Sequence, residues 1–207
     1  MAEDVAANSA EAEILPPPLA GVRVLDFTAV VSGPFCTVLL ADMGAEVVKV
    51  EPPLGENTRH AVRYPGRGEQ DEDYFYVNNR SKKSLALDLK NPTARKLIHE
   101  MAKKADIVVE NFAPGTAARL GIAWDDLRPL NEKVVYCSVS GFGQDGPYRD
   151  RLALDPIVQG YSGIMSITGQ ADGPPTLTGA SITDAISGVT AAYAIAAALC
   201  ATRQDGK

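Results

Sequence analysis

The 207-residue chain is poor in histidine, which limits the catalytic chemistry it can support. His60 and His99 are its only histidines, and the chain has no H-E-x-x-H pair, no G-x-S-x-G turn and no Walker-type phosphate loop. His99 falls among charged residues in an expected helix and is predicted to be a solvated surface residue. Without a candidate histidine base, we expect any catalysis to depend on a carboxylate.

The chain also has few cysteines. Cys36, Cys137 and Cys200 are odd in number, lie far apart and form no C-x-x-C pair, so they predict neither a zinc ribbon nor a disulfide framework. We therefore expect no metal site and a reducing, cytoplasmic environment.

Basic runs and long hydrophobic runs are scarce as well. A formal net charge of −6 without a Lys/Arg cluster argues against nucleic-acid binding, which depends on cations at phosphates. Residues 1–18 are acidic, end in three prolines and lack the basic start of a signal peptide, so they predict a disordered tail. Residues 185–201 carry no charge, but they are mostly alanine and predict a buried helix, with no membrane as a partner.

From residue 19 onward, β-branched apolar runs alternate with helical spacing. Five runs predict strands: G-V-R-V-L-D-F, E-V-V-K-V-E, S-L-A-L-D-L-K, D-I-V-V-E-N-F and K-V-V-Y-C-S-V-S. Helices are expected at residues 35–44, from Asn91-Pro92 through Met101, just before Gly121, and at residues 124–130. The polar segment at residues 52–83 is interpreted as a binding loop. This alternation predicts a doubly wound α/β fold with a mainly parallel, Rossmann-like sheet.

Ligands of such sheets bind beyond the carboxyl ends of the strands, which makes residues 29–34, 88–91, 111–115 and 140–146 the site candidates. The last of these contains G-F-G-Q-D-G, which matches a dinucleotide-binding pattern. A dinucleotide site needs a helix that opens directly after the glycines, and here Pro147 and a polar turn follow instead. We interpret the segment as a glycine-rich loop at the rim of a cleft, and not as a nicotinamide site.

Seven segments occur in a fixed order between residues 19 and 207. They are L-x-G-V-R-V-L-D-F-T with Gly33-Pro34, G-A-E-V-V-K-V-E, N-R-S-K-K-S-L-A-L-D-L-K, A-D-I-V-V-E-N-F-A-P-G, S-G-F-G-Q-D-G-P-Y, D-G-P-P, and Ser181-Ile-Thr-Asp184 before an alanine-rich helix. No single segment is decisive, but the ordered set resembles the class III CoA-transferases of the formyl-CoA and carnitine-CoA type.

This resemblance implies transfer of coenzyme A from an acyl-CoA to a free carboxylic acid, with acyl-CoA as a substrate and no permanently bound cofactor. Asp184 stands at the position of the family's nucleophile, which forms a mixed anhydride and then an aspartyl-CoA thioester. The thiolate leaves readily because the pKa of a thiol is only about 8.5. From the residues alone, Asp184 is also a helix N-cap candidate, and the two roles are compatible.

The resemblance places the CoA contacts on ten residues. They are Val31, Ser32, Leu87, Asp88, Leu89, Lys90, Asn111, Phe112, Ala113 and Arg119. Lys90 and Arg119 are expected to pair with phosphate groups. Pro52 departs from the pattern, because relatives can carry an arginine there that contacts the nucleotide. We therefore expect Lys49, Arg59 or another cation of the polar segment to take its place.

Two alternatives remain. The fold also hosts α-methylacyl-CoA racemases, which need a histidine immediately before an aspartate. Leu154 precedes Asp155 here, so the transferase is favoured. Asp155 is expected near the acyl end of the substrate.

Relatives in this family are longer, form interlocked homodimers and continue past Lys207 into a small second domain. Residues 19–207 are therefore predicted to be an incomplete CoA-binding large domain, and an inactive CoA-binding fragment is the other alternative.

Overall fold

Five short strands form one all-parallel sheet in the computed structural model, which describes residues 15–60 and 73–204. The strands are β1 (Arg23–Asp26), β2 (Glu46–Glu51), β3 (Lys83–Ala86), β4 (Ile107–Glu110) and β5 (Val135–Ser138), paired in the order β3-β2-β1-β4-β5. Each lies within or overlaps a predicted run, and the predicted α/β fold is confirmed. The chain changes direction across the sheet between β1 and β4, which makes their carboxyl ends the switch point where ligands bind. Most of the predicted tail lies outside the described residues.

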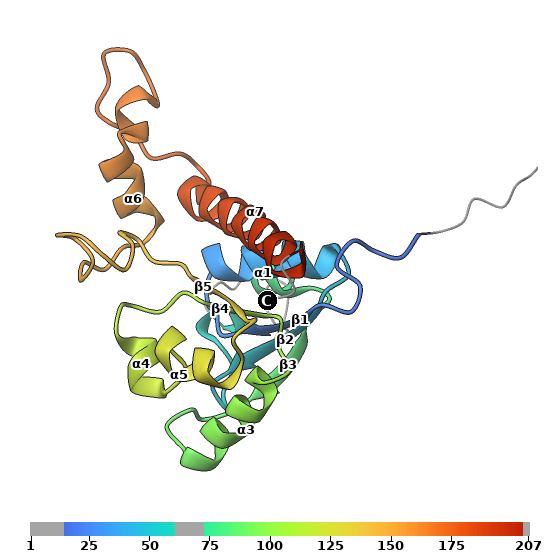
Figure 1. Ribbon diagram of the computed structural model, residues 1–207. Helices are drawn as coiled ribbons and strands as arrows, with labels where there is room; N and C mark the ends of the chain where they lie inside the picture. Colours follow the sequence, from blue (N-terminus) through green and yellow to red (C-terminus); the bar gives the residue numbers. More distant parts are fainter. Residues whose placement is uncertain (1–14, 61–72, 205–207) are drawn as a thin grey trace, which may run out of the picture.

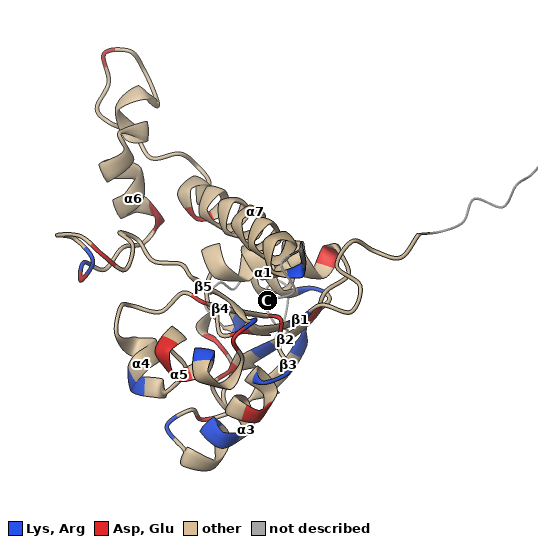
Figure 2. Ribbon diagram, viewed as in Figure 1, with Lys and Arg blue, Asp and Glu red and all other residues tan. Residues whose placement is uncertain are grey.

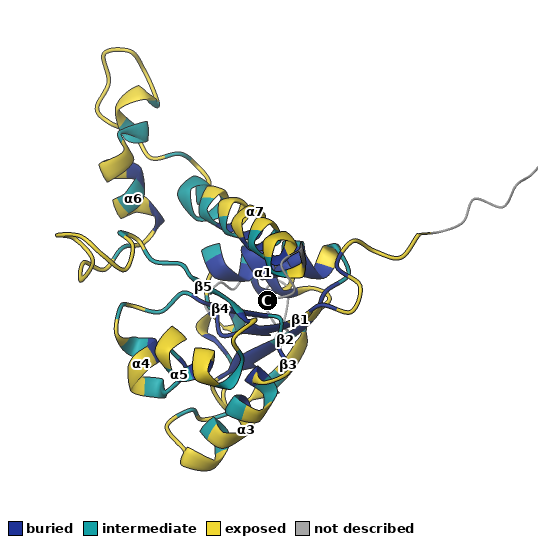
Figure 3. Ribbon diagram, in the orientation of Figure 1, coloured by how far each residue is buried: buried dark blue, intermediate teal, exposed yellow. Residues whose placement is uncertain are grey.

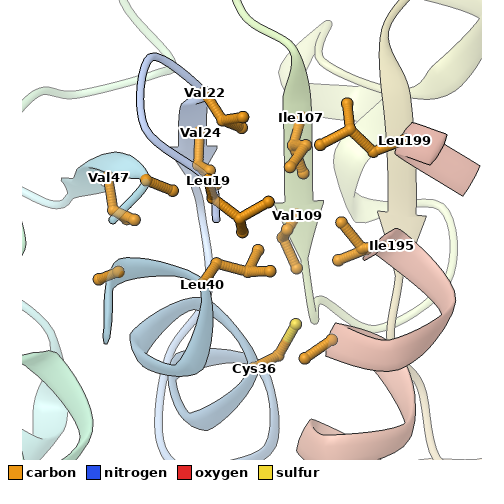
Figure 4. Close-up of a cluster of buried hydrophobic side chains, with 13 residues drawn as sticks. Leu19, Val22, Val24, Cys36, Leu40, Val47, Ile107, Val109, Ile195 and Leu199 are labelled. Atoms are coloured by element: carbon orange, nitrogen blue, oxygen red, sulfur yellow. The ribbon is translucent and has the colours of Figure 1, made fainter. Parts of the chain in front are cut away.

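Helices cover both faces of the sheet (Figure 1). α1 (Ser32–Asp42) and α7 (Ile182–Gln204) lie on one face, and α3 (Pro92–Ala102), α4 (Thr116–Leu120) and α5 (Trp124–Leu127) lie on the other. The strands feed both layers because successive side chains point to opposite faces. Val24, Ile107 and Val109 pack under α1 and α7, whereas Leu25 and Val108 pack against the α3 side. Figure 4 shows the first of these clusters, which closes around Leu40 and Ile195.

The start of α3 follows the predicted chemistry. Pro92 is its first residue, and the Asn91 side chain accepts a hydrogen bond from the N–H of Thr93 at 2.9 Å. The prediction of a solvated His99 is wrong. Its Nε2 lies 2.7 Å from the carbonyl oxygen of Gly121, because the turn that ends α4 comes back onto α3.

The polar segment at residues 52–83 is not a simple loop. It contains a short 3-10 helix, η1 (Asn57–Arg59), and the helix α2 (Asp73–Asn79), while residues 61–72 lie outside the described chain. The remaining elements are η2 (Arg128–Leu130), α6 (Asp155–Ser162) and η3 (Ile164–Ile167). The part of the chain that carries α6 and η3 extends away from the sheet, and α7 returns along α1 (Figure 1).

The prediction of a buried helix at residues 185–201 is only half correct. Ala192, Ile195 and Leu199 form a buried stripe along α7 with helical spacing. The other side of α7 is exposed (Figure 3). It includes Val189 and Tyr193, and Tyr193 is 76% exposed. Among the described helices, α7 alone is long and apolar enough to cross a membrane. A single helix of this kind is weak evidence for a membrane span, because the core helix of a globular protein can have the same composition. The buried stripe of α7 packs in the hydrophobic core and accounts for part of its apolar composition.

Gly188 allows α7 to approach the start of α1 very closely. A Cβ atom at this position would lie 2.8 Å from the carbonyl oxygen of Ser32 and 3.0 Å from Cδ1 of Phe35. Real Cβ atoms essentially never approach a neighbour this closely, so a larger residue would push the helices apart. This contact places the first turn of α7 next to the first turn of α1.

The contact predicts that Gly188→Ala lowers the free energy of unfolding by about 1–3 kcal/mol, the usual cost of overpacking. Gly160→Ala is the matched control, because it is also helical but its Cβ would meet only Met165 Sδ, at 3.7 Å. Helix propensity should make that control neutral or more stable by up to about 1 kcal/mol. Urea unfolding of both variants measures the difference, and equal effects would contradict a tight α1–α7 contact.

Candidate functional site

A buried ion pair supports the loop that follows β1. Asp26 is fully buried, and its Oδ2 accepts hydrogen bonds from Lys82 Nζ at 3.0 Å and from Thr37 Oγ1 at 2.7 Å. Its Oδ1 accepts from the N–H of Thr28 at 2.8 Å. Burial alone would raise the pKa of Asp26, but the positive charges of Lys82 and Lys49 and these hydroxyl contacts hold the pKa below its usual value. The carboxylate therefore stays charged and fixes the end of β1.

Lys49 belongs to the same buried network. Its ammonium group is 1% exposed, donates to the carbonyl oxygen of Thr28 at 2.7 Å, and lies 3.6 Å from Glu56 Oε1. The prediction that Lys49 contacts a nucleotide in place of an arginine is therefore wrong, because its ammonium group is enclosed between Thr28 and Glu56.

The other cation predicted for this role, Arg59, forms a bidentate pair with Glu51. Its Nε donates to Glu51 Oε2 at 2.8 Å and its Nη2 donates to Oε1 at 2.7 Å. The guanidinium also lies over the ring of Phe75, 3.8 Å from the centroid. These contacts hold Arg59 at the carboxyl end of β2, and its proposed contact with a nucleotide stays a prediction.

Asn111 bridges the switch point between β1 and β4. Its Oδ1 accepts from the N–H of Ala29 at 2.8 Å, and its Nδ2 donates to the carbonyl oxygen of Ala29 at 2.7 Å. Gly33 sits against this bridge, since a Cβ there would lie 2.4 Å from Thr28 Cγ2. Both polar atoms of the Asn111 side chain therefore hold the backbone of the loop. A ligand in the pocket would contact the side of Asn111 that faces away from Ala29.

Three cavities lie beyond the carboxyl ends of the strands. The β2–β3 pocket has a volume of about 370 Å³, the Asp184 pocket about 220 Å³, and the β4–β5 pocket about 350 Å³. The predicted CoA contacts divide among them: Leu87, Asp88, Leu89 and Lys90 line the first, Val31, Ser32 and Asn111 line the second, Ala113 lines the third, and Phe112 lines all three. Phe112 therefore separates the pockets from one another.

Arg119 is the predicted contact that stands apart. It lines none of these three described pockets, is exposed on α4, and donates from Nη2 to Thr116 Oγ1 at 2.7 Å. No cluster of three or more metal-binding side chains occurs in residues 15–60 and 73–204.

Asp184 lies on the wall of its pocket in the first turn of α7. It is the third residue of that helix, so the prediction that it is the N-cap is wrong. Another carboxylate serves the start of α7 instead. Asp155 Oδ1 accepts from the N–H of Thr183 at 2.8 Å, from Thr183 Oγ1 at 2.6 Å, and from the N–H of Asp184 at 3.3 Å.

Asp155 is a buried neighbour of Asp184. It is only 8% exposed and does not line the Asp184 pocket, and its Oδ2 accepts from the side chain of Gln159 on the same helix, α6. It joins the start of α6 to the start of α7, and its expected place near the acyl end of the substrate stays a prediction. Figure 2 shows acidic residues at both helix starts.

The pKa values of these two carboxylates are driven apart. Burial raises the pKa of Asp184 to about 6, and the negative charge of Asp155 acts in the same direction. Burial alone would also raise the pKa of Asp155, but hydrogen bonds from Thr183, Gln159 and the N–H of Asp184 outweigh burial and lower it. Both groups are thus ionised at neutral pH, and Asp184 is the more basic and more nucleophilic of the two.

Tyr74 is a neighbour of this site that the sequence interpretation missed. It comes from α2 and hydrogen-bonds to Ser181. Burial raises its pKa, and the negative charges of Asp184 and Asp155 raise it further. The aromatic residues in D-Y-F-Y-V-N-N, within an otherwise polar segment, are the signal that could have located it.

Because the pKa of Asp184 is raised in the folded state, ionisation of this carboxyl group lowers the free energy of unfolding. The folded state holds the proton more tightly than the unfolded state, so stability is greatest below the unfolded pKa and falls as pH rises through about 6. Asp184→Asn should therefore raise Tm at pH 8 and raise it less at pH 4.5. We expect roughly 2–4 °C at pH 8, or about 1 kcal/mol at this size, after allowing for solvent screening of a half-buried group. Thermal unfolding at both pH values measures this, and an equal shift at both would contradict it.

Comparison with known proteins identifies a family for this chain. The family described as CoA-transferase family III matches residues 19–207. A succinate–glutarate CoA-transferase from Agrobacterium fabrum is 42% identical over 196 residues, which cover 92% of this chain and 49% of the relative. A formyl-CoA:oxalate CoA-transferase from Streptomyces avermitilis is 43% identical over 189 residues, which cover 91% of this chain and 46% of the relative.

Solved structures give the same result. The crystal structure of a CAIB/BAIF family protein from Brucella suis matches with a TM-score of 0.88 at 35% identity, covering 93% of this chain and 52% of that chain. A hypothetical protein from Mycobacterium tuberculosis matches with a TM-score of 0.83 at 37% identity, covering 92% and 51%. The chain spans about half the length of these relatives. With the family match across residues 19–207 and a parallel sheet of the same architecture, the chain belongs to CoA-transferase family III.

Proposed function

We propose that the protein transfers coenzyme A from an acyl-CoA to a free carboxylic acid, with Asp184 as the nucleophile. The observation that carries this proposal is a half-buried carboxylate, with a pKa raised to about 6, on the wall of a pocket at the carboxyl edge of the sheet. A carboxylate of this kind is ionised at neutral pH and more basic than an ordinary aspartate. Membership of the family supplies the reaction class.

In the first half-reaction, a carboxylate oxygen of Asp184 attacks the thioester carbonyl carbon of the acyl-CoA. The carbon–sulfur bond breaks, and CoA leaves as a thiolate, which gives a mixed anhydride between Asp184 and the acyl group. The thiolate then attacks the aspartyl carbonyl carbon. The donor acid leaves as a carboxylate, and an aspartyl-CoA thioester remains.

The second half-reaction reverses these steps with the acceptor acid. The acceptor carboxylate attacks the aspartyl thioester and releases the CoA thiolate. The thiolate then attacks the acceptor's carbonyl carbon in the new anhydride, which forms the product acyl-CoA and restores the carboxylate of Asp184. Every leaving group is a thiolate or a carboxylate, so the cycle needs no proton relay, which fits a site without histidine.

The start of α1 is placed to assist this chemistry. Val31 and Ser32 line the Asp184 pocket at the positive end of the helix. A thioester carbonyl held there would develop negative charge next to backbone N–H groups as Asp184 attacks, and this charge would be stabilised.

The nucleotide part of CoA is assigned to the β2–β3 pocket. Leu87 and Leu89 offer apolar contact there, and the exposed Lys90 is available for a phosphate group. The exposed Arg119 is a second candidate cation for phosphate, outside the pocket. The acyl and acceptor ends would lie at the Asp184 pocket, and the names of the relatives point to small carboxylic acids such as succinate, glutarate or oxalate.

Leu154 favours a transferase over a racemase. It lines the Asp184 pocket at the place where racemases need a histidine, and its side chain cannot exchange a proton. Proton exchange at the α-carbon of an acyl-CoA in deuterated water, without an acceptor acid, would instead favour the racemase.

A trapping experiment tests the nucleophile directly. The full-length protein is incubated with succinyl-CoA and then with hydroxylamine, which converts an acylated aspartate into a hydroxamate that peptide mass spectrometry can locate. We expect the modification on Asp184, its loss in Asp184→Asn, and no change in Asp150→Asn, which alters an exposed surface carboxylate. A hydroxamate on another residue, or full activity of Asp184→Asn, would end the proposal.

The pH profile tests the link between the two carboxylates. Transfer requires ionised Asp184, so the rate should fall about tenfold per pH unit below about 6. Asp155→Asn keeps an oxygen that accepts from Thr183 but removes the charge that raises the pKa of Asp184, so the acid limb should move to lower pH. The Asp150→Asn variant should keep the wild-type profile. A limb that stays in place in Asp155→Asn would show that Asp155 does not act on Asp184.

Relatives in this family are about twice as long as this chain, and we propose that the active form is an interlocked homodimer that includes the remaining half. The 207-residue chain alone should therefore turn over acyl-CoA far more slowly than full-length relatives. Turnover by the purified chain at the rate of a full-length relative would contradict this expectation.

A further inference from the structure

Glu56 is a buried carboxylate, and one of its two oxygens holds a backbone N–H group of the β1–α1 loop. It follows β2, is only 4% exposed, and its Oε2 accepts from the N–H of Val30 at 2.9 Å. Its other oxygen accepts from Thr58 Oγ1 at 2.6 Å and lies 3.6 Å from Lys49 Nζ. Burial of a carboxylate is costly unless hydrogen bonds and an opposite charge compensate it, as Val30, Thr58, Asn79 and Lys49 do here.

Val30 is the residue that this carboxylate holds, and it has an unusual backbone. Its φ angle is 72°, in the left-handed region that β-branched residues strongly disfavour. Its side chain is 41% exposed, so packing contributes little to holding this conformation. The contacts at Val30 and at the residue before it are those of Glu56 with Val30 and of Asn111 with Ala29. Such strain persists only where the surroundings enforce it.

The strained residue directly precedes the part of the loop that faces Asp184. Val31 and Ser32 open α1 and line the Asp184 pocket. Within the described chain, the N–H groups of Val31 and Ser32 donate to no protein acceptor. The conformation of Val30 therefore decides where these two free donors point.

We propose that Glu56 is a positioning residue, which holds Val30 in the left-handed conformation so that the N–H groups of Val31 and Ser32 face the carbonyl that Asp184 attacks. Its effect on catalysis rests on the proposed function, whereas its effect on the loop does not. Glu56 contacts no reacting atom in this proposal and acts only through Val30.

The first test needs no ligand. Amide hydrogen exchange is measured at Val30 in the wild-type chain and in Glu56→Gln, where the neutral amide holds the N–H less strongly. We expect exchange at Val30 to rise at least about tenfold in Glu56→Gln. It should stay unchanged in the control Glu100→Gln, which alters an exposed carboxylate paired with Lys103. Unchanged exchange at Val30 in a folded Glu56→Gln overturns the proposal. If that variant does not fold, Thr58→Val, which removes one of the donors to the Glu56 carboxylate, is measured against the same expectation.

The second test is a rescue that a general structural role would not produce. Glycine adopts a φ near 72° without strain and alanine does not. Val30→Gly therefore relieves the backbone strain at residue 30, whereas Val30→Ala removes the same branched side chain and leaves the strain. In full-length protein, Glu56→Gln should lower kcat for acyl transfer at least about tenfold. Adding Val30→Gly should recover much of that loss, and adding Val30→Ala should not. Equal recovery by both, or by neither, contradicts the proposal.

The two proposals fail in distinguishable ways. If Asp184 is not acylated but Val30 exchange rises in Glu56→Gln, the positioning of the loop stands and the proposed chemistry falls. If Asp184 is acylated but Val30 exchange does not change, the chemistry stands and the role of Glu56 falls.

Discussion

The contact between α1 and α7 at Gly188 is the constraint on which the site depends. A side chain at this position would collide with the carbonyl oxygen of Ser32, so the two helix starts can lie together only because residue 188 is glycine. One helix start contributes Asp184, and the other contributes the N–H groups of the β1–α1 loop. Helix packing thus brings to one pocket the carboxylate that we propose as the nucleophile and the N–H groups that we propose as donors to the thioester oxygen.

Buried charges then fix each side of this pocket. Asp155 joins α6 to α7 and sets the direction of the first turn that carries Asp184. On the other side, Asp26 with Lys82, and Glu56 with Lys49, lie under the β1–α1 loop. In the described chain, no buried side-chain nitrogen or oxygen lacks a hydrogen-bond partner. The contacts of these carboxylates are therefore structural, whereas Asp184 lines its own pocket and has a raised pKa.

The sequence predicted the elements whose signals are local. β-branched runs located all five strands, and Asn91-Pro92 located the start of α3, because apolar periodicity and capping act within a few residues. It failed where distant segments decide the environment. Lys49 looks like a surface cation until the β1–α1 loop, with Thr28, is placed against it. Likewise, the hydrogen bonds of Asp155 reach across 28 residues to Thr183. The position of Asp184 came from the ordered motifs of a family, and no periodic pattern would have singled it out.

The central claim is that the fold makes Asp184 unusually basic while it keeps Asp155 acidic. Carbon-13 NMR titration of the aspartate carboxyl groups, with Asp184→Asn and Asp155→Asn to assign the signals, measures both values in this chain. The account predicts a midpoint near 6 for Asp184 and a midpoint below the ordinary aspartate value for Asp155. A midpoint for Asp184 at or below about 3.9, the value of an unperturbed aspartate, would contradict it.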